Sequence, residues 1–224
     1  AKGKLIVIES GSDASGKATQ TEKLYNRLLE EAYKVQTVSF PSYDKEYSSL
    51  VRMYLSGDFG KKAEDVDCYV ASTFFTVDRY ASYKTVWGPF YEEGGIILCD
   101  RYTTSNMVHQ AAKLQDGEKD KYLEWLWDLE FNLYKLPKPD LVLFLDVTPK
   151  VTARLIENRP SKIDGTSEKD IHERDEDYLR KSYENSLYVA NKYNWTKINC
   201  VIDDKMRSIE SIHDEILSKV KEIL

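Results

Sequence analysis

The chain has 224 residues, of which 42% are hydrophobic and 31% charged, and its formal net charge is −6 with a pI of about 5.3. This acidic balance argues against a general binder of nucleic acid or of anionic membranes, because such proteins need extended basic surfaces. The length suits one domain with insertions, and apolar runs such as residues 141–145 are far too short to span a bilayer.

The first predicted element is a short buried strand at residues 5–8. A loop of small residues follows, and Lys17 opens a segment whose apolar residues recur with helical spacing. Strand, G-x-x-x-x-G-K and helix together are typical of a phosphate-binding loop, in which backbone N–H groups, the helix dipole and the lysine contact phosphate. The residues assigned to this site are Gly11, Ser12, Ala14, Ser15, Gly16, Lys17, Ala18 and Thr19.

Position 18 departs from the usual pattern, in which a Ser or Thr hydroxyl after the lysine binds Mg²⁺. The methyl group of Ala18 cannot bind a metal, and Thr19 points about 100° away along the helix. Either phosphates, water and a carboxylate hold the Mg²⁺, or the metal site is weakened.

The rest of the chain alternates between apolar strands and helices. Strands are predicted at 35–40, 96–99, 141–146 and 197–202, and helices at 45–57, 65–87, 104–115, 118–134 and 171–193, with one from Pro149 and one at the end of the chain. Gly88-Pro89 should close the 65–87 helix, and Asp116-Gly117 should separate the next two. Residues 159–170 are polar and rich in turn formers, which indicates a loop.

This alternation predicts an α/β fold with a parallel sheet covered by helices on both faces. Ligands of such folds bind at the carboxyl ends of the strands. The site should therefore be built from the polar residues that follow the strands, at 11–17, 41–43 and 100–102 and at Asp146.

The three cysteines, Cys68, Cys99 and Cys200, are odd in number and lack metal-ligand spacing. They indicate reduced thiols, and with the absence of a signal-peptide pattern we expect a cytoplasmic protein. His172 and His213 are expected on the surface.

Asp100, Arg101 and Tyr102 follow a buried strand and should share an edge with the phosphate loop. The acid can hold Mg²⁺, and the arginine can bridge phosphates or bind a phosphate acceptor through two hydrogen bonds. The alternative is a salt bridge at the strand end.

Phe75 and Arg79 are four residues apart in a predicted helix and so share one face. An aromatic ring beside a guanidinium suits a groove that binds a base and a phosphate. The alternative is that Phe75 is an ordinary core residue.

The segment 154–181 is rich in cations that could close over a transferring phosphoryl group and exclude water. The alternative is a solvated surface of mixed charge, because acidic residues are interspersed. Its basic residues are Arg154, Arg159, Lys162, Lys169, Arg174, Arg180 and Lys181.

Five segments together resemble the thymidylate kinases, members of the nucleoside-monophosphate kinase group, over nearly the whole chain. They are G-S-D-A-S-G-K-A-T-Q at 11–20, F-P-S-Y at 40–43, F-T-V-D-R-Y at 75–80, D-R-Y-T-T-S-N at 100–106 and P-K-P-D-L-V-L-F-L-D-V-T-P at 137–149. The resemblance implies a three-layer fold of one domain over residues 1–224. It has a five-stranded parallel sheet of order 2-3-1-4-5 and a lid at about 155–175.

The same resemblance implies transfer of the ATP γ-phosphate to dTMP, with ATP and Mg²⁺ bound and two copies forming a homodimer. It implies no nucleic-acid or membrane partner. In the donor site Lys17 would be joined by Arg154, and Asp100 would support the metal.

On the acceptor side the resemblance assigns Asp13 to the sugar hydroxyl, Phe75 to stacking on thymine and Arg79 to the base edge. Arg101 would hold the acceptor phosphate, and the residues near the base, sugar or phosphate would be Phe40, Tyr43, Ser105, Asn106 and His109.

The chain also departs from the family pattern. Ala14 replaces an arginine found in some members, so the catalytic cation should come from the lid, at Arg159, Lys162 or Arg174. Some members place an arginine where this chain has Ser42 and Tyr43, so fewer donors remain here for the acceptor phosphate. His109 stands where many members have a tyrosine that excludes a 2′-hydroxyl.

Two alternatives stay open at this point. One is a kinase of another nucleoside monophosphate or of a deoxynucleoside. The other is a nucleotide-binding relative without catalysis, suggested by Ala18.

Overall fold

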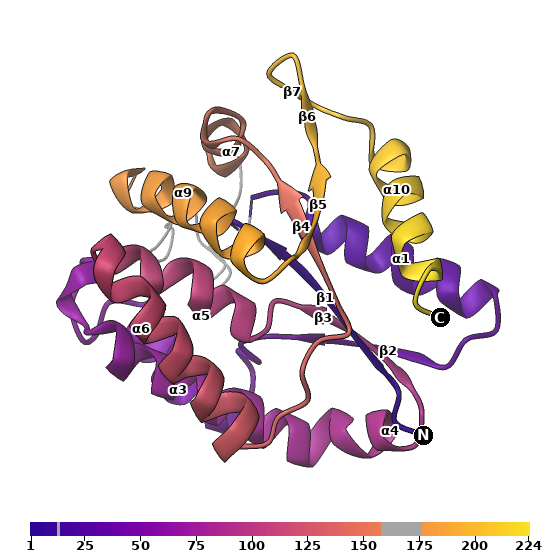
Figure 1. Ribbon diagram of the computed structural model, residues 1–224, viewed down its shortest axis with the longest axis horizontal. Helices are drawn as coiled ribbons and strands as arrows, with labels where there is room; N and C mark the ends of the chain where they lie inside the picture. Colours follow the sequence, from indigo (N-terminus) through magenta and orange to yellow (C-terminus); the bar gives the residue numbers. More distant parts are fainter. Residues whose placement is uncertain (13, 158–175) are drawn as a thin grey trace.

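The centre of the molecule is a five-stranded sheet of order β2-β3-β1-β4-β5 in which every neighbouring pair is parallel (Figure 1). The computed structural model describes residues 1–12, 14–157 and 176–224. The five strands are β1 (Lys4–Ser10), β2 (Val35–Ser39), β3 (Ile96–Asp100), β4 (Leu141–Asp146) and β5 (Thr196–Asn199). The predicted fold class and strand order are confirmed.

Helices cover both faces of this sheet (Figure 1). One face carries α1 (Lys17–Glu30) and α10 (Ile209–Lys221), and the other carries α3 (Cys68–Ser82), α5 (Thr103–His109), α6 (Asp116–Trp127) and α9 (Glu176–Lys192). The shorter helices are α2 (Ser49–Leu55), α4 (Gly88–Glu92) and α7 (Pro149–Ile156). Within the described residues, no helix combines the length and apolar content of a membrane span.

The alternation of side chains along β1 divides the core into two layers. Leu5 and Val7 pack into the layer under α3, α5, α6 and α9, whereas Ile6 and Ile8 pack into the layer under α1 and α10. All four side chains are fully buried. A strand buried on both faces explains why this segment is continuously apolar in sequence.

The predicted strand at 197–202 is wrong in its second half. The sheet strand β5 ends at Asn199, and β6 (Val201–Ile202) pairs antiparallel with β7 (Lys205–Met206) in a separate hairpin. Asp203 and Asp204 form its turn with positive φ angles of 51° and 59°, which aspartate tolerates better than most residues. Apolar spacing cannot show which partner a strand chooses.

Several predicted helix ends also differ. The 65–87 segment continues through a π-helical turn at Tyr83–Trp87 into α4, because Pro89 stands in the first turn of α4, where its missing N–H costs nothing. Gly117 lies inside α6, and the chain breaks instead at Leu114 and Gln115, which are extended.

The segments predicted as helices at 45–57 and 118–134 are each helical in two parts. The first begins with a 3₁₀ turn at Glu46–Ser48 before α2, and the second ends in a π-helical turn at Asp128–Leu133 after α6.

All three cysteines are buried and free of disulfides. Burial raises the pKa of the Cys68 thiol to about 11 and that of Cys200 to about 12, and it raises the pKa of Cys99 well above its usual value. His213 is 6% exposed, so the prediction of a surface histidine is wrong there. His172 lies outside the described residues.

We predict that at about pH 8 the native thiols react with Ellman's reagent at least about a hundredfold more slowly than those of the urea-unfolded chain. The thiolate fraction should fall from about a quarter at a pKa of about 8.5 to about a thousandth at a pKa of 11. The absorbance of the released thiolate gives the rate. Fast stoichiometric reaction of any one thiol in the native protein would contradict this burial.

Candidate functional site

The carboxyl ends of β1 and β3 lie side by side and bring two polar segments together. Ile8 is the register partner of Asp100, and the N–H of Arg101 donates to the Ile8 carbonyl at 3.2 Å. Arg101 has a φ of 72°, a left-handed conformation that costs energy in a residue other than glycine. The phosphate-loop segment and residues 100–102 therefore share one edge, as the strand pattern predicts.

The loop between β1 and α1 is held by serine hydroxyls and left open at the helix end. Ser15 Oγ donates to Ser10 Oγ at 3.0 Å, and Ser10 Oγ donates to the Ser12 carbonyl. Gly16 has a φ of 82°, nothing lies within 4 Å of the position its Cβ would take, and no described side chain caps α1. The first N–H groups of α1 thus remain available to an anion.

Ser12 adds a second sign of a ligand at this loop. Its side chain is 6% exposed, and its Oγ has no hydrogen-bond partner among the described residues. Buried polar groups are almost always paired in native proteins. An orphaned hydroxyl beside an open helix N-terminus fits a bound phosphate.

Lys17 is 1% exposed, and its Nζ lies 2.6 Å from Oδ1 of Asp100. The predicted phosphate cation and the predicted metal carboxylate therefore form an ion pair in this structure. Mg²⁺ commonly uses one or two carboxylates with phosphates and water. No cluster of three or more metal-binding side chains occurs in the described ranges, so the donor set fits Mg²⁺ only together with a bound polyphosphate.

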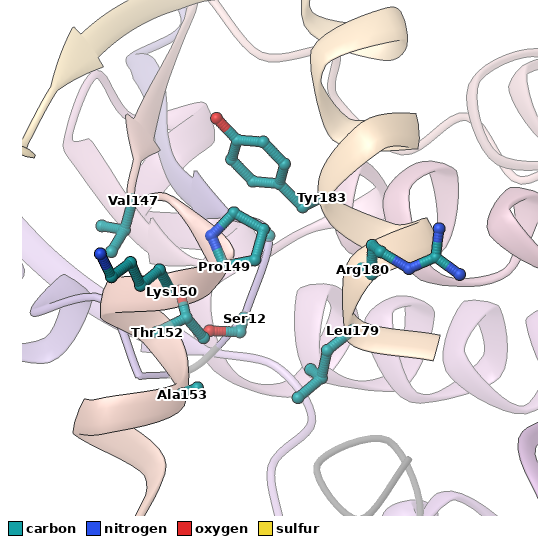
Figure 2. Close-up of a pocket in the computed structure, with 10 residues that line it drawn as sticks. Ser12, Val147, Pro149, Lys150, Thr152, Ala153, Leu179, Arg180 and Tyr183 are labelled. Carbon is teal, nitrogen blue, oxygen red and sulfur yellow. The ribbon is translucent and has the colours of Figure 1, made fainter. Parts of the chain in front are cut away.

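A cavity of about 310 Å³ lies beside the loop, between α7 and α9 (Figure 2). The Tyr183 hydroxyl donates to Asp146 Oδ1 at 2.9 Å, and burial, together with this bond, raises the pKa of Tyr183 to about 12. Arg180 lines the cavity, but its guanidinium extends away from α7 and pairs with Asp177 on the same helix. The lining residues are Gly11, Ser12, Val147, Pro149, Lys150, Thr152, Ala153, Leu179, Arg180 and Tyr183.

Arg154 projects from α7 toward the turn between β6 and β7. Its Nη2 donates to the Asp204 carbonyl at 2.7 Å, and Lys150 pairs with the Asp204 carboxylate at 3.0 Å. These two contacts tie the small hairpin to α7. Ala18 and Thr19 are exposed on α1.

Arg79 is 1% exposed and forms an ion pair with Glu130, which is fully buried, so the pair has almost no contact with solvent. Nε donates to Glu130 Oε1 at 2.7 Å, and Nη2 donates to Glu130 Oε2 and to Oδ1 of Asn106. Burial by itself lowers the pKa of Arg79, but the Glu130 carboxylate raises the value above its usual range. Arg79 is therefore a fixed, fully charged group.

Phe75 lies one turn before Arg79 on α3 and is 7% exposed. Its ring packs edge-on against Tyr54, with centroids 6.0 Å apart. Phe40 is 4% exposed and packs edge-on against Tyr102 at 5.7 Å. Both predicted acceptor aromatics thus belong to the packed core.

The residues predicted near the base are all buried on α5. Ser105 Oγ donates to Glu9 Oε2 at 2.7 Å, as does Thr104 Oγ1. Asn106 is 2% exposed and His109 is 4% exposed. Glu9, fully buried, thus anchors the first turn of α5 to the end of β1.

Tyr43 follows the cis peptide Phe40-Pro41 and is partly exposed. Arg52 Nη1 donates to the carbonyl oxygens of Tyr43 and Lys45. The turn itself has no arginine at position 43, but Arg52 of α2 stabilises it through these two hydrogen bonds.

Asp13, Arg159, Lys162 and Arg174 lie outside the described residues, as does most of the proposed lid at 155–175.

Glu130 was missed by the sequence analysis. It stands 51 residues from Arg79 within a segment predicted simply as helix, and no motif marks it. The one signal available was indirect, because a buried arginine needs a carboxylate partner.

The family model described as thymidylate kinase matches residues 8–216. The chain belongs to the thymidylate kinase family. Among curated relatives, the thymidylate kinase of Mycobacterium tuberculosis is 30% identical over 179 residues, which cover 80% of this chain and 81% of the relative. The probable thymidylate kinase of Pyrococcus horikoshii is 30% identical over 222 residues, covering 98% and 97% of the two chains.

The fold agrees with this membership. The thymidylate kinase of Candida albicans, whose structure was reported to reveal an origin of broad substrate specificity, matches with a TM-score of 0.71 at 20% sequence identity. The match covers 99% of this chain and 92% of that one. At this identity the likeness concerns the fold alone.

We predict that Gly16→Ala lowers the free energy of unfolding by about 1–2 kcal/mol, because alanine must adopt the left-handed conformation. Gly117→Ala is the matched control, since it lies in α6 with equally open space and no positive φ. It should be neutral or stabilising by about 0.5 kcal/mol. Urea denaturation measures both. Equal effects of the two substitutions would show that backbone conformation at Gly16 is unimportant.

Proposed function

We propose that this chain transfers the γ-phosphate of ATP to dTMP, giving dTDP and ADP. The proposal rests chiefly on the open phosphate loop with Lys17 buried beside Asp100, in a chain of the thymidylate kinase family. One kinase domain over residues 1–224, with a lid at about 155–175, is proposed with it, because the family model matches 8–216 as one segment.

On the donor side, ATP would lie with its phosphates at the open N-terminus of α1. Backbone N–H groups of the loop, the Ser12 hydroxyl and Lys17 would bind the phosphate oxygens, and Arg154 would contact the nucleotide beside the β6–β7 turn. Asp100 would hold Mg²⁺ with water and phosphates. When bound there, the ion neutralises charge that develops on the phosphoryl oxygens.

On the acceptor side, dTMP would lie between α3 and α5. Phe75 would stack on thymine, and Arg79 would donate to the base edge. Arg101 would bind the acceptor phosphate, and a lid cation, Arg159 or Arg174, would meet the transferring group. The remaining proposed contacts are Asp13, Phe40, Tyr43, Ser105, Asn106 and His109.

In the transfer, an oxygen of the dTMP phosphate forms a bond to the γ-phosphorus while the bond from that phosphorus to the β–γ bridging oxygen breaks. The leaving ADP takes the electron pair. Because Lys17 is paired with Asp100 at 2.6 Å, it must turn from the carboxylate to the phosphates when ATP binds. The ion pair holds the cation at the loop until then.

We further propose a homodimer formed through α3, and a cytoplasmic location that suits three free thiols. Val70 and Val77, two turns apart on α3, are 49% and 45% exposed, and Tyr80 is 38% exposed. An apolar row on a surface helix suits burial against another subunit.

The reaction is tested by ADP release with dTMP, dUMP, UMP, CMP and thymidine as acceptors. We expect the highest kcat/KM with dTMP. A preference for a ribonucleotide or for thymidine would assign the chain to another kinase reaction. No ADP release with any acceptor, from protein that binds ATP, would indicate a relative that does not catalyse.

Lys17→Met should lower kcat for dTMP at least about a hundredfold at saturating ATP, because it removes a preorganised charge at the transferring phosphate. Lys23→Met is the control on the same helix, since Lys23 pairs with Glu210 at the surface. That variant should keep kcat within about twofold. Near wild-type turnover by Lys17→Met, with an unchanged thermal midpoint, would remove Lys17 from the reaction.

A further inference from the structure

Glu130 is the centre of a buried hydrogen-bond network that joins three elements. Its carboxylate is fully buried in the π-helical turn at Asp128–Leu133. Besides the two bonds from Arg79, it accepts from Thr76 Oγ1 of α3 at 2.8 Å and from Thr103 Oγ1 of α5. Four donors therefore saturate one carboxylate and fix its position.

The network leaves Arg79 little freedom. Nε donates to Glu130, and Nη2 donates to Glu130 and to Asn106. The guanidinium also lies over the Tyr102 ring, 5.9 Å from its centroid. Nη1 is the only nitrogen of the group without an acceptor among the residues that the structure describes.

The orientation of the Asn106 amide follows from the same bond. A guanidinium can only donate, so the atom of Asn106 that faces Nη2 must be the oxygen. The NH₂ group of Asn106 is then left as a donor. Both side chains next to the proposed base site therefore present N–H groups.

This donor pattern discriminates between pyrimidines. The C4 position of thymine or uracil carries a carbonyl, which accepts from an N–H group. Cytosine carries an amino group there, which would face another donor and lose its hydrogen bond on burial. Because the charges of Arg79 and Glu130 cancel, the pair presents an N–H donor to the base without adding net charge there.

We propose that Glu130 is a positioning residue that sets the base specificity of this enzyme: by binding Nε and Nη2 of Arg79, it leaves Nη1 to read a C4 carbonyl and to reject a C4 amino group. The inference rests on the proposed function, because it takes the base to lie at Arg79. Stability alone does not account for the pair, since a buried ion pair is often no more stable than apolar residues of similar volume.

The test compares equilibrium binding of dTMP, dUMP and dCMP by calorimetry in the wild type and variants. We expect the wild type to bind dTMP and dUMP at least about a hundredfold more tightly than dCMP. Glu130→Gln should reduce this preference about tenfold, with the ratio of dTMP to dUMP and the affinity for ATP unchanged. Ser72→Ala is the structural control, because it removes a buried hydrogen bond between α3 and Tyr122 of α6 without touching Arg79.

A double-mutant cycle keeps the test decisive if Glu130→Gln folds poorly. Arg79→Gln and Arg79→Gln/Glu130→Gln should have the same low preference for dTMP over dCMP, because Glu130 acts only through Arg79. The double variant removes both buried charges and so avoids leaving one unpaired.

Two results would overturn the proposal. One is a lower thermal midpoint of Glu130→Gln with the full preference for dTMP, as a purely structural role requires. The other is a preference that survives Arg79→Gln. Because binding is measured directly, failure of the kinase reaction in the wild type is seen separately, by the ADP-release assay.

Discussion

The parallel pairing of β1 with β3 is the constraint on which the site depends. Ile8 stands opposite Asp100, so the loop that leaves β1 meets the turn that leaves β3, and Lys17 can bond Asp100 at 2.6 Å. A shift of one residue in this register would turn Asp100 to the other face of the sheet. The position of the phosphate-loop lysine is therefore set by strand pairing as much as by the loop.

Two ion pairs, Lys17–Asp100 at this edge and Arg79–Glu130 among the helices, differ in a way that suits their proposed roles. In the Lys17–Asp100 pair, the side chain of Asp100 is 15% exposed. A ligand can therefore reach this pair and replace Asp100 as the partner of Lys17. The Arg79–Glu130 pair is sealed, at 1% and 0% exposure, and shares further hydrogen bonds with Asn106. The first suits a cation that must move to a phosphate, and the second suits an arginine that must stay fixed.

Much of the fold could be predicted from the sequence because the patterns that indicate strands, turns and helix starts are local. Continuous apolar strands such as β1 and β4 predicted the parallel sheet, and G-x-x-x-x-G-K at 11–17 predicted the turn where Gly16 takes a φ of 82°. Pro149 marked the start of α7 correctly. The predicted helix ends were wrong where a residue occurs both at helix ends and within helices. Pro89 lies in the first turn of α4 instead of ending a helix, and Gly117 lies inside α6.

By itself, the sequence determined the α/β class, the phosphate loop and the family, since these depend on short patterns of residues. Only the tertiary structure decided which charges meet. Glu130 reaches Arg79 across 51 residues, Glu9 anchors α5, and residues 201–202 leave the main sheet for their own hairpin. Such pairings depend on long-range packing, where burial of an arginine demands a carboxylate but does not say which one.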